Sequence, residues 1–295
     1  MSFKASDVKT LREQTGAGMM ACKKALTETN GDMEAAVDFL RKKGLAAAQK
    51  KQSRVAAEGT VATLVEGNKG VLVEVNCETD FVSKGDDFQG FAKSVANDIL
   101  KEGYADITAL KAAKESDVNE LTLKLGEKID IRRFVAKNTD GALGSYNHGG
   151  RIGVLVEVKG ADASNEQVQE LLKDVAMHVA AASPKFLSAN DIDEEFKKKE
   201  AAIYAAQLKE EGKPENMIDK IVDGKLKKLS SEVCLLEQKF VKDPDLTVGK
   251  LVEKVGKEVG AELTLTSFNM LTLGEGIEKK EDNLADEVAK MTGGN

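Results

Sequence analysis

A six-residue segment that occurs twice constrains the fold of this chain more than any other feature. The sequence Gly-Val-Leu-Val-Glu-Val occupies residues 70–75 and again residues 153–158. Each copy follows a glycine-containing turn, and each precedes a helical pattern that contains Val-Ala, at residues 95–96 and 175–176. A β-branched run bounded by a turn predicts a strand, and its repetition predicts two similar structural units. We therefore expect an α+β fold with a duplicated core of two subdomains.

Three short helical patterns precede the duplicated core. Ser6 is placed to cap the first helix and Asp32 to cap the third, and apolar residues repeat at helical spacing in all three. The stretch 41–54 follows with six basic residues and no acidic one, which predicts a helical or frayed linker. We expect residues 1–54 to form a three-helix domain with its basic linker.

Two charged segments predict an arm inserted into the second subdomain. Residues 191–208 and 215–229 carry narrow apolar seams, with Ile203 in the first, and a tight reversal at 212–214 joins them. Such a pair predicts an antiparallel coiled coil. Further helices are expected at 86–101, 118–128, 247–259 and 284–291, and further strands at 60–65, 129–136 and 262–273. The expected domains after residue 54 are a first core subdomain (55–140), a second core subdomain (141–274) with the insertion at 191–229, and a C-terminal helical module (275–295).

Composition narrows the classes of function. The 295-residue chain has a net charge of −7, which argues against a protein that wraps nucleic acid non-specifically. The three cysteines, Cys22, Cys77 and Cys234, are far apart and odd in number, which is typical of a reducing cytosol. We find no apolar run long enough to span a membrane and no secretory signal. We therefore expect a cytoplasmic protein with no direct nucleic-acid or membrane partner.

Residue patterns for catalysis are missing from the sequence. No phosphate-binding glycine motif, no metal-binding cysteine or histidine motif and no catalytic pair of carboxylates can be recognised. His178 lies among apolar residues of a predicted helix, where a packing role is expected. His148 lies in a predicted glycine-rich turn and is available to a partner. We therefore expect no enzyme activity, no metal and no cofactor, but a protein that binds another protein.

The loop after the first repeated strand is three residues longer than its counterpart and contains Cys-Glu-Thr-Asp-Phe-Val at residues 77–82. Two interpretations of Phe81 are open. The ring could plug the loop onto the core of this chain, or it could be exposed beside Asp80 and anchor a partner, as buried aromatic side chains do at interfaces.

Several segments together resemble the bacterial elongation factor Ts family, the nucleotide exchange factors for elongation factor Tu. These segments are residues 11–13, 15–20, 22–26, 74–82, 131–133, 144–148, 151–154 and 274–278, and Thr79–Val82 is the most specific of them. The resemblance implies a ubiquitin-associated-type N-terminal bundle, a duplicated core, an inserted coiled coil and a C-terminal helical module. It also implies that the protein binds elongation factor Tu with GDP, disturbs its magnesium and phosphate site, and promotes GDP release so that GTP can rebind in translation elongation.

The resemblance further implies which residues act. In the family, the segment that matches Thr79, Asp80, Phe81 and Val82 enters near the magnesium of the partner and helps to dislodge it. The positions that match family contacts with the partner are Arg12, Met19, Met20, Lys23, Leu125 and His148. Met19 and Met20 lie about 100° apart on a helix, so both cannot point to one core.

Two other classes of function compete with the exchange factor. The N-terminal bundle could belong to an adaptor that recognises a peptide or a ubiquitin-like protein, since that fold serves such modules. Partner binding would then survive removal of the loop at residues 79–82. The basic stretch 41–54 could instead bind RNA in a translation accessory protein, and this binding would fall steeply with salt.

Overall fold

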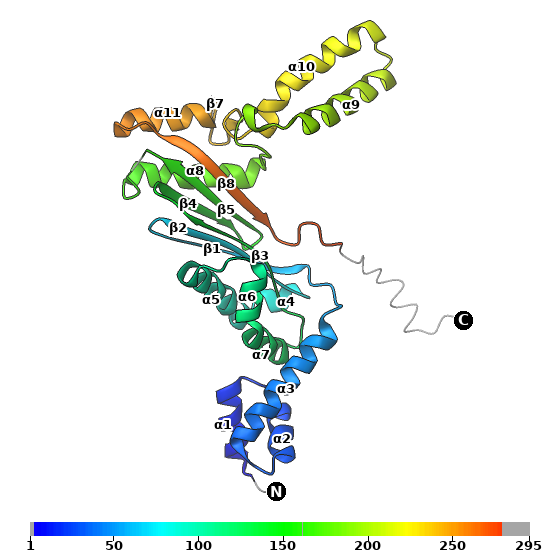
Figure 1. Cartoon of the computed structure of the whole chain (residues 1–295), viewed down its shortest axis with the longest axis vertical. Coiled ribbons are helices and arrows are strands. Elements are labelled where there is room, and N and C mark those ends of the chain that lie inside the picture. The colour runs from blue at the N-terminus through cyan, green and yellow to red at the C-terminus, as the bar shows by residue number, and fades with distance from the viewer. Residues whose placement is uncertain (1–2, 161, 279–295) are drawn as a thin grey trace, which may run out of the picture. The chain divides into compact units, whose positions relative to one another are not determined.

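The computed structural model describes residues 3–160 and 162–278 (Figure 1). The chain divides into two compact units, each described here by itself. The first contains residues 1–62, 73–134 and 272–295, and the second contains residues 63–72 and 135–271. Helices and small sheets in both units confirm the expected α+β class. The domain boundaries expected from the sequence stay predictions.

The N-terminal bundle consists of three helices, as expected. They are α1 (Ala5–Thr15), α2 (Met19–Glu28) and α3 (Met33–Lys51), and their small core contains Leu11, Cys22, Ala25, Leu26, Ala36 and Leu40. Asp32 caps α3 as predicted, because its Oδ1 accepts a hydrogen bond from the Ala35 N–H at 3.0 Å. The predicted cap at Ser6 is wrong. The N-cap is Lys4, two residues earlier, and the helix starts at Ala5; the Asp7 carboxylate accepts from the Lys4 N–H at 2.7 Å.

Most of the basic stretch 41–54 is the second half of α3 and not a frayed linker. This half packs against α7 (Glu115–Leu125), and Gly44 permits the close approach, since a Cβ there would lie 3.1 Å from the Asn119 carbonyl oxygen. Three of the six basic side chains have hydrogen-bond or ion-pair partners in the first unit, and Lys43 lies over the Phe39 ring. Arg41 faces Glu120, Lys51 donates to the Gly126 carbonyl, and Arg54 pairs with Glu78. The basic surface that this stretch could offer to RNA is therefore smaller than its sequence suggests.

The first repeated strand belongs to a sheet of order β1-β2-β3. The strands are β1 (Glu58–Glu66), β2 (Lys69–Cys77) and β3 (Asp130–Asn138). The long helix that follows is α5 (Asp86–Glu102), which buries Phe88, Val95 and Ile99 on one face, as its spacing predicts. Two short helices, α4 (Asp80–Ser83) and α6 (Ile107–Ala113), were not expected. The helix expected at 118–128 is α7, and it ends at Leu125 because Gly126 turns the chain with a φ of 78°.

The second repeated strand is β5 (Ile152–Lys159), which confirms the duplication. It pairs antiparallel with β4 (Ala142–His148) in a sheet of order β4-β5-β8, whose third strand is β8 (Thr264–Thr272). The helix α8 (Glu166–Ala182) follows β5 as α5 follows β2, and both contain 17 residues. The core of this unit joins Val154, Val156 and Val158 of β5 to Leu172 and Val175 of α8. The remaining elements are η1 (Ala189–Asp191), β6 (Lys239–Phe240), β7 (Asp243–Thr247) and α11 (Val248–Val259).

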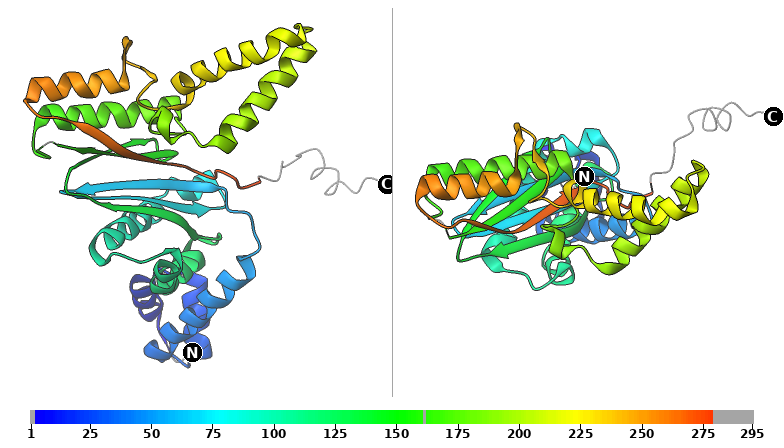
Figure 2. Two further views of the ribbon diagram at one scale, coloured as in Figure 1. Left: turned by 45° about the horizontal axis from the view of Figure 1, so that its top comes forward. Right: turned by 90° about the horizontal axis from the view of Figure 1, so that it is seen from above.

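The predicted arm is present in the second unit. The helices α9 (Glu194–Glu210) and α10 (Glu215–Val233) run side by side in opposite directions (Figure 2). Leu208, Ile218 and Val222 are buried between them, with Tyr204 packed against this seam. The prediction for Ile203 is wrong, because its side chain is 41% exposed. The seam of α9 follows Tyr204 and Leu208, one residue further along the helix.

The predicted packing role of His178 is confirmed. His178 on α8 is buried, its Nε2 lies 3.0 Å from Gln238 Oε1, and its Nδ1 receives the Val241 N–H at 3.3 Å. Burial lowers the pKa of His178, so the ring is held neutral. All three cysteines are buried as free thiols. Burial raises the pKa of Cys77 to about 12 and that of Cys234 to about 11, which makes both thiols poor nucleophiles.

The expected C-terminal module, residues 275–295 with a helix at 284–291, lies mostly outside the described residues. Residues 274–278, which the structure describes, follow β8. No helix in the described ranges is sufficiently long and apolar to cross a membrane.

Candidate partner-binding site

The segment Thr79–Val82 forms a single helical turn that directs Phe81 outward. Thr79 is the N-cap of α4, and its Oγ1 accepts from the Val82 N–H at 3.4 Å. Ser83 closes the turn on the inner side, because it is buried and donates from Oγ to the Asp80 carbonyl at 2.9 Å. Phe81 is 85% exposed. The ring is therefore not a plug in the core of this chain, and a large apolar side chain stands free for a partner.

Asp80 gives this turn a negative charge beside the exposed ring. Its Oδ2 accepts from Lys84 Nζ at 2.6 Å, one helical turn further on. The hydrogen bond from Lys84 is the main reason that the pKa of Asp80 lies below its usual range. The carboxylate is thus ionised at neutral pH and, being exposed, can exchange Lys84 for another cationic partner.

Two glutamates to which the sequence assigned no role hold the start of this segment. Glu127 follows α7, and its carboxylate accepts hydrogen bonds from the Glu78 N–H, the Thr79 N–H and the Thr79 hydroxyl. Glu78 in turn accepts from the Lys128 N–H at 2.7 Å. The family resemblance covered Glu78, but no local pattern in the sequence indicates which residue pairs with it.

The four predicted contact residues of the N-terminal bundle gather around one groove of about 490 Å³. Arg12 comes from α1, and Met19, Met20 and Lys23 come from the first turns of α2. Met19 is 59% exposed and Met20 is 75% exposed, so neither belongs to the core. The groove combines apolar and basic lining, completed by Phe3, Lys4, Ala5, Val8 and Lys9. Flexible methionines beside cations are suited to a protein surface that has both apolar and acidic groups.

Leu125 and His148 lie at the ends of their elements. Leu125 is the half-buried last residue of α7, within the first unit. His148 is exposed and belongs to the second unit, where it is the last residue of β4 and the first residue of the predicted turn, since its carbonyl accepts from the Arg151 N–H at 3.0 Å. Its Nδ1 lies 3.0 Å from the Tyr146 hydroxyl, and Gly149 and Gly150 make the turn behind it. The imidazole is thus oriented by a neighbour and open to a partner.

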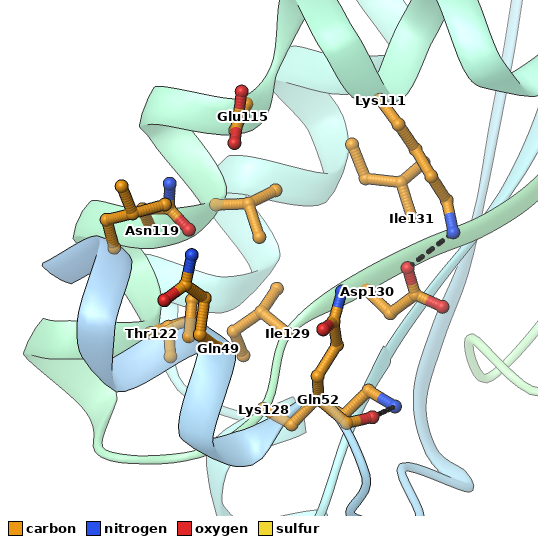
Figure 3. Close-up of a pocket in the computed structure, with 13 residues that line it drawn as sticks. Gln49, Gln52, Lys111, Glu115, Asn119, Thr122, Lys128, Ile129, Asp130 and Ile131 are labelled. Atoms are coloured by element: carbon orange, nitrogen blue, oxygen red, sulfur yellow. Dashed lines mark hydrogen bonds and ion pairs between the residues drawn. The ribbon is translucent and has the colours of Figure 1, made fainter.

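A second hollow of about 340 Å³ lies between α3, α7 and the start of β3 (Figure 3). Gln49, Asn119 and Thr122 are among the residues that line it, and the ion pair of Lys111 with Asp130 at 2.7 Å closes one side. None of the predicted partner-binding residues is in its lining. The hollow lies where α3 packs on α7.

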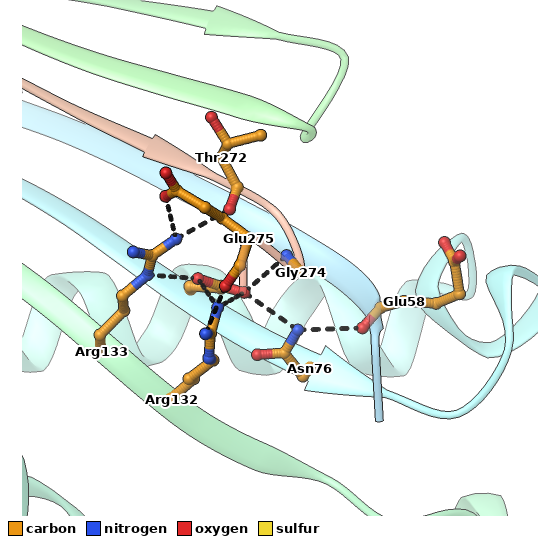
Figure 4. A network of polar contacts seen from close by, with 8 residues as sticks. Glu58, Asn76, Arg132, Arg133, Thr272, Gly274 and Glu275 are labelled. Carbon is orange, nitrogen blue, oxygen red and sulfur yellow. Dashed lines mark hydrogen bonds and ion pairs between the residues drawn. The ribbon is translucent and has the colours of Figure 1, made fainter. Parts of the chain in front are cut away.

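Three of the motifs that carry the family resemblance meet at one buried carboxylate (Figure 4). Glu74 of β2 is fully buried and accepts from Arg132 at 3.1 Å, from Arg133 at 2.6 Å and from the Gly274 N–H at 2.8 Å. Burial alone raises the pKa of Glu74, but these hydrogen bonds outweigh it and hold the pKa below its usual range. Arg133 also pairs with Glu275 at 3.0 Å. The network fastens the segment after β8 to the sheet of the first unit.

Within residues 3–160 and 162–278, no group of three or more histidine, cysteine or acidic side chains is placed to hold a metal ion. The features described above are an exposed aromatic ring beside a carboxylate, an exposed pair of methionines around a basic groove, and an exposed oriented histidine. Such features are typical of a protein-binding surface.

Comparison with known proteins gives the family. The sequence model described as "Elongation factor TS" matches residues 78–275. An elongation factor Ts from Clostridium perfringens is 52% identical over 300 residues, covering 98% of this chain and 99% of the relative. Those from Trichlorobacter lovleyi and Magnetococcus marinus are 49% and 47% identical, covering 99% and 100% of both chains respectively. The chain belongs to the elongation factor Ts family.

Proposed function

We propose that this protein is a nucleotide exchange factor that binds elongation factor Tu with GDP and promotes GDP release, so that GTP can rebind during translation elongation. The observation that carries the proposal is the exposed Phe81 beside the ionised Asp80, in a chain of the elongation factor Ts family. The protein catalyses no covalent step in this proposal. It acts in the cytoplasm, where translation takes place, without a cofactor of its own and without direct contact with nucleic acid or membrane.

In this mechanism, one set of residues binds the partner and another promotes the release of GDP. Arg12, Met19, Met20 and Lys23 hold the partner at the groove of the N-terminal bundle, with Leu125 as a further apolar contact. His148, which belongs to the second unit, contacts the phosphate-loop region of elongation factor Tu. These contacts supply affinity, because burial of methionine and leucine side chains is favourable and the basic groups select an acidic surface.

The release step belongs to Thr79–Val82. The ring of Phe81 enters an apolar pocket on the partner near its magnesium site, and a pocket filled by an aromatic side chain supplies a large share of local binding energy. The carboxylate of Asp80 then competes for the groups that support the magnesium ion. Since that ion neutralises the charge of the GDP phosphates, its displacement weakens the hold on the nucleotide.

One experiment tests the proposal directly. Elongation factor Tu is loaded with fluorescent GDP, mixed in a stopped-flow instrument with excess unlabelled GDP, and followed with and without a substoichiometric amount of this protein. We expect faster release with many turnovers per molecule and an unchanged final ratio of bound to free nucleotide. Release at the intrinsic rate would refute the proposed function. RNA binding that falls steeply with salt, or binding of a peptide or a ubiquitin-like protein in place of elongation factor Tu, would instead favour the competing classes.

A further inference from the structure

Glu127 accepts three hydrogen bonds from residues 78 and 79, at the start of the Thr79–Val82 segment. Its Oε2 accepts from the Glu78 N–H at 3.0 Å and from the Thr79 N–H at 2.9 Å. Its Oε1 accepts from the Thr79 hydroxyl at 2.6 Å. All three donors lie immediately before Asp80 and Phe81. One carboxylate therefore fixes both the backbone and the N-cap side chain at the start of the turn, with hydrogen bonds of the strong, charge-assisted kind.

The connection is reciprocal. While Glu127 binds the backbone of residues 78–79, Glu78 Oε1 binds the backbone N–H of Lys128 at 2.7 Å. Arg54 Nη1 lies 3.2 Å and 3.1 Å from the two carboxylate oxygens of Glu78, and Lys128 Nζ donates to the Arg54 carbonyl at 3.0 Å. The end of β2 and the segment after α7 are thus joined in both directions.

Glu127 follows the helix α7, which contacts two other helices of the first unit. The preceding helix α7 is fixed to α5 by Lys124 Nζ and Asp87 Oδ1 at 2.7 Å, and to α3 by Lys51, which donates to the Gly126 carbonyl. By contrast, α4 is one turn of four residues, which is too short to be stable by itself. The direction of Phe81 must therefore be set by contacts outside the turn, and Glu127 makes three of them.

We propose that Glu127 is the positioning residue of the exchange reaction: it fixes Thr79, and through Thr79 the direction in which Phe81 and Asp80 face the partner. The inference rests on the proposed function, in which these two side chains act. Glu127 reaches them only through the backbone and the cap. Because Leu125 lies two residues before Glu127, the same contacts hold this further contact position at a constant separation from Phe81.

The test uses the full-length variant Glu127→Gln, which keeps the size of the side chain. It removes the charge from all three hydrogen bonds: the amide oxygen can still accept from the two N–H groups, but the NH₂ group can only donate to Thr79 Oγ1, so the bond with the hydroxyl reverses its direction and the charge assistance is lost. Asp117→Asn is the matched control, because Asp117 is an exposed acid on α7 that pairs with Lys114. In Glu127→Gln without partner, we expect hydrogen exchange at the Glu78 and Thr79 amides to rise roughly tenfold or more, as local opening becomes easier.

With the partner present, Glu127→Gln should slow GDP release roughly ten- to a hundredfold, the size of effect that a small misplacement of an acting group causes. Binding to elongation factor Tu should weaken by less than about threefold, since the groove of the N-terminal bundle is untouched. Asp117→Asn should behave as wild type in all three measurements.

A double variant separates positioning from a general loss of structure. If Glu127 acts through Phe81, adding Glu127→Gln to Phe81→Ala should change the release rate by less than about twofold, because the two residues form one unit. Equal slowing in both backgrounds, unchanged amide exchange, or a wild-type release rate in the single variant would each overturn the proposal. Failure of the wild-type protein to accelerate release would refute the proposed function, whereas the amide measurement judges the contacts of Glu127 independently.

Discussion

Two phenylalanines that lie close together in the sequence have opposite environments. Phe81 on α4 is 85% exposed, whereas Phe88 on α5 is fully buried, as are Ala92 and Val95 on the same helix. The difference follows from the elements that carry them. In α5 the apolar residues repeat at helical spacing and define an inner face, while the single turn of α4 turns Ser83 inward and leaves Phe81 outside.

This contrast gives a matched pair of variants. We expect Phe81→Ala to change the free energy of unfolding by less than about 0.5 kcal/mol, as at most surface positions. GDP release should slow by roughly ten- to 150-fold, which corresponds to one lost aromatic contact of about 1.5–3 kcal/mol. Phe88→Ala should instead destabilise the fold by ~3–5 kcal/mol. Thermal melts and GDP-release rates of both variants test whether Phe81 contacts the partner or packs in the core. A large fall in Tm for Phe81→Ala with normal release would contradict the proposed role.

Asp80 gives a second prediction at the scale of one residue. Asp80→Asn preserves shape and removes the charge that competes near the magnesium ion of the partner. We expect slower GDP release in the presence of magnesium and a smaller defect after chelation, because the assisted step has then already occurred. Stopped-flow rates with and without chelator measure this. A defect of equal size in both conditions would show that Asp80 acts elsewhere in the reaction.

The buried Glu74 predicts how stability depends on pH. Its pKa in the folded protein lies below the ordinary value of 4.5, so the unfolded chain binds a proton more readily. The stabilisation is therefore complete above pH 4.5 and is lost as the pH falls from there through the folded-state pKa. Near pH 7, Glu74→Gln should cost about 3–5 kcal/mol, because Arg132 and Arg133 lose a buried partner.

The measurement for Glu74 is the free energy of unfolding of wild type and Glu74→Gln in urea, at neutral pH and at about pH 4. We expect the difference between the two proteins to shrink in acid as the wild-type carboxyl is protonated. A difference that stays constant with pH would mean that the shape of the side chain, and not its charge, fastens Gly274 to the sheet.

At the scale of elements, periodicity decides what the sequence can predict. The helices α5 and α8 and the strands β2 and β5 are long and periodic, and their approximate positions follow from burial patterns alone. The short elements α4, α6, β6 and β7 lack such a period. The contacts of Glu74 with Gly274 and of Glu127 with Thr79 join segments far apart in the chain, where no local pattern exists. In α9 the sequence predicts Ile203 in the apolar seam, whereas Tyr204 occupies it, because both residues are apolar enough to face α10 on an otherwise charged helix.

The packing of α3 on α7 gives a prediction for a pair of elements. A Cβ at Gly44 would lie 3.1 Å from the Asn119 carbonyl oxygen, so Gly44→Val should separate the helices and destabilise the protein by about 1–3 kcal/mol. Gly90 on α5 has open space around it, so Gly90→Ala should stabilise the fold by roughly 0.5–1 kcal/mol. Urea melts of both variants test this, and stabilisation by Gly44→Val would contradict the close packing.

At the scale of the whole molecule, the proposed function requires that nucleotide and exchange factor oppose each other on the partner. The factor by which this protein lowers the affinity of elongation factor Tu for GDP must equal the factor by which GDP lowers the affinity for this protein, because both describe one thermodynamic cycle. Excess GDP should therefore dissociate a preformed complex, and titration should show the apparent Kd for this protein rising in proportion to GDP once the nucleotide site is more than half filled.

Phe81→Ala should reduce the coupling between GDP binding and binding of this protein. The variant lacks a contact that competes with the bound magnesium and nucleotide, while the groove with Arg12, Met19 and Met20 still binds. Calorimetric titration of elongation factor Tu at several GDP concentrations measures both affinities. A complex whose Kd is independent of GDP would be that of an adaptor and not of an exchange factor.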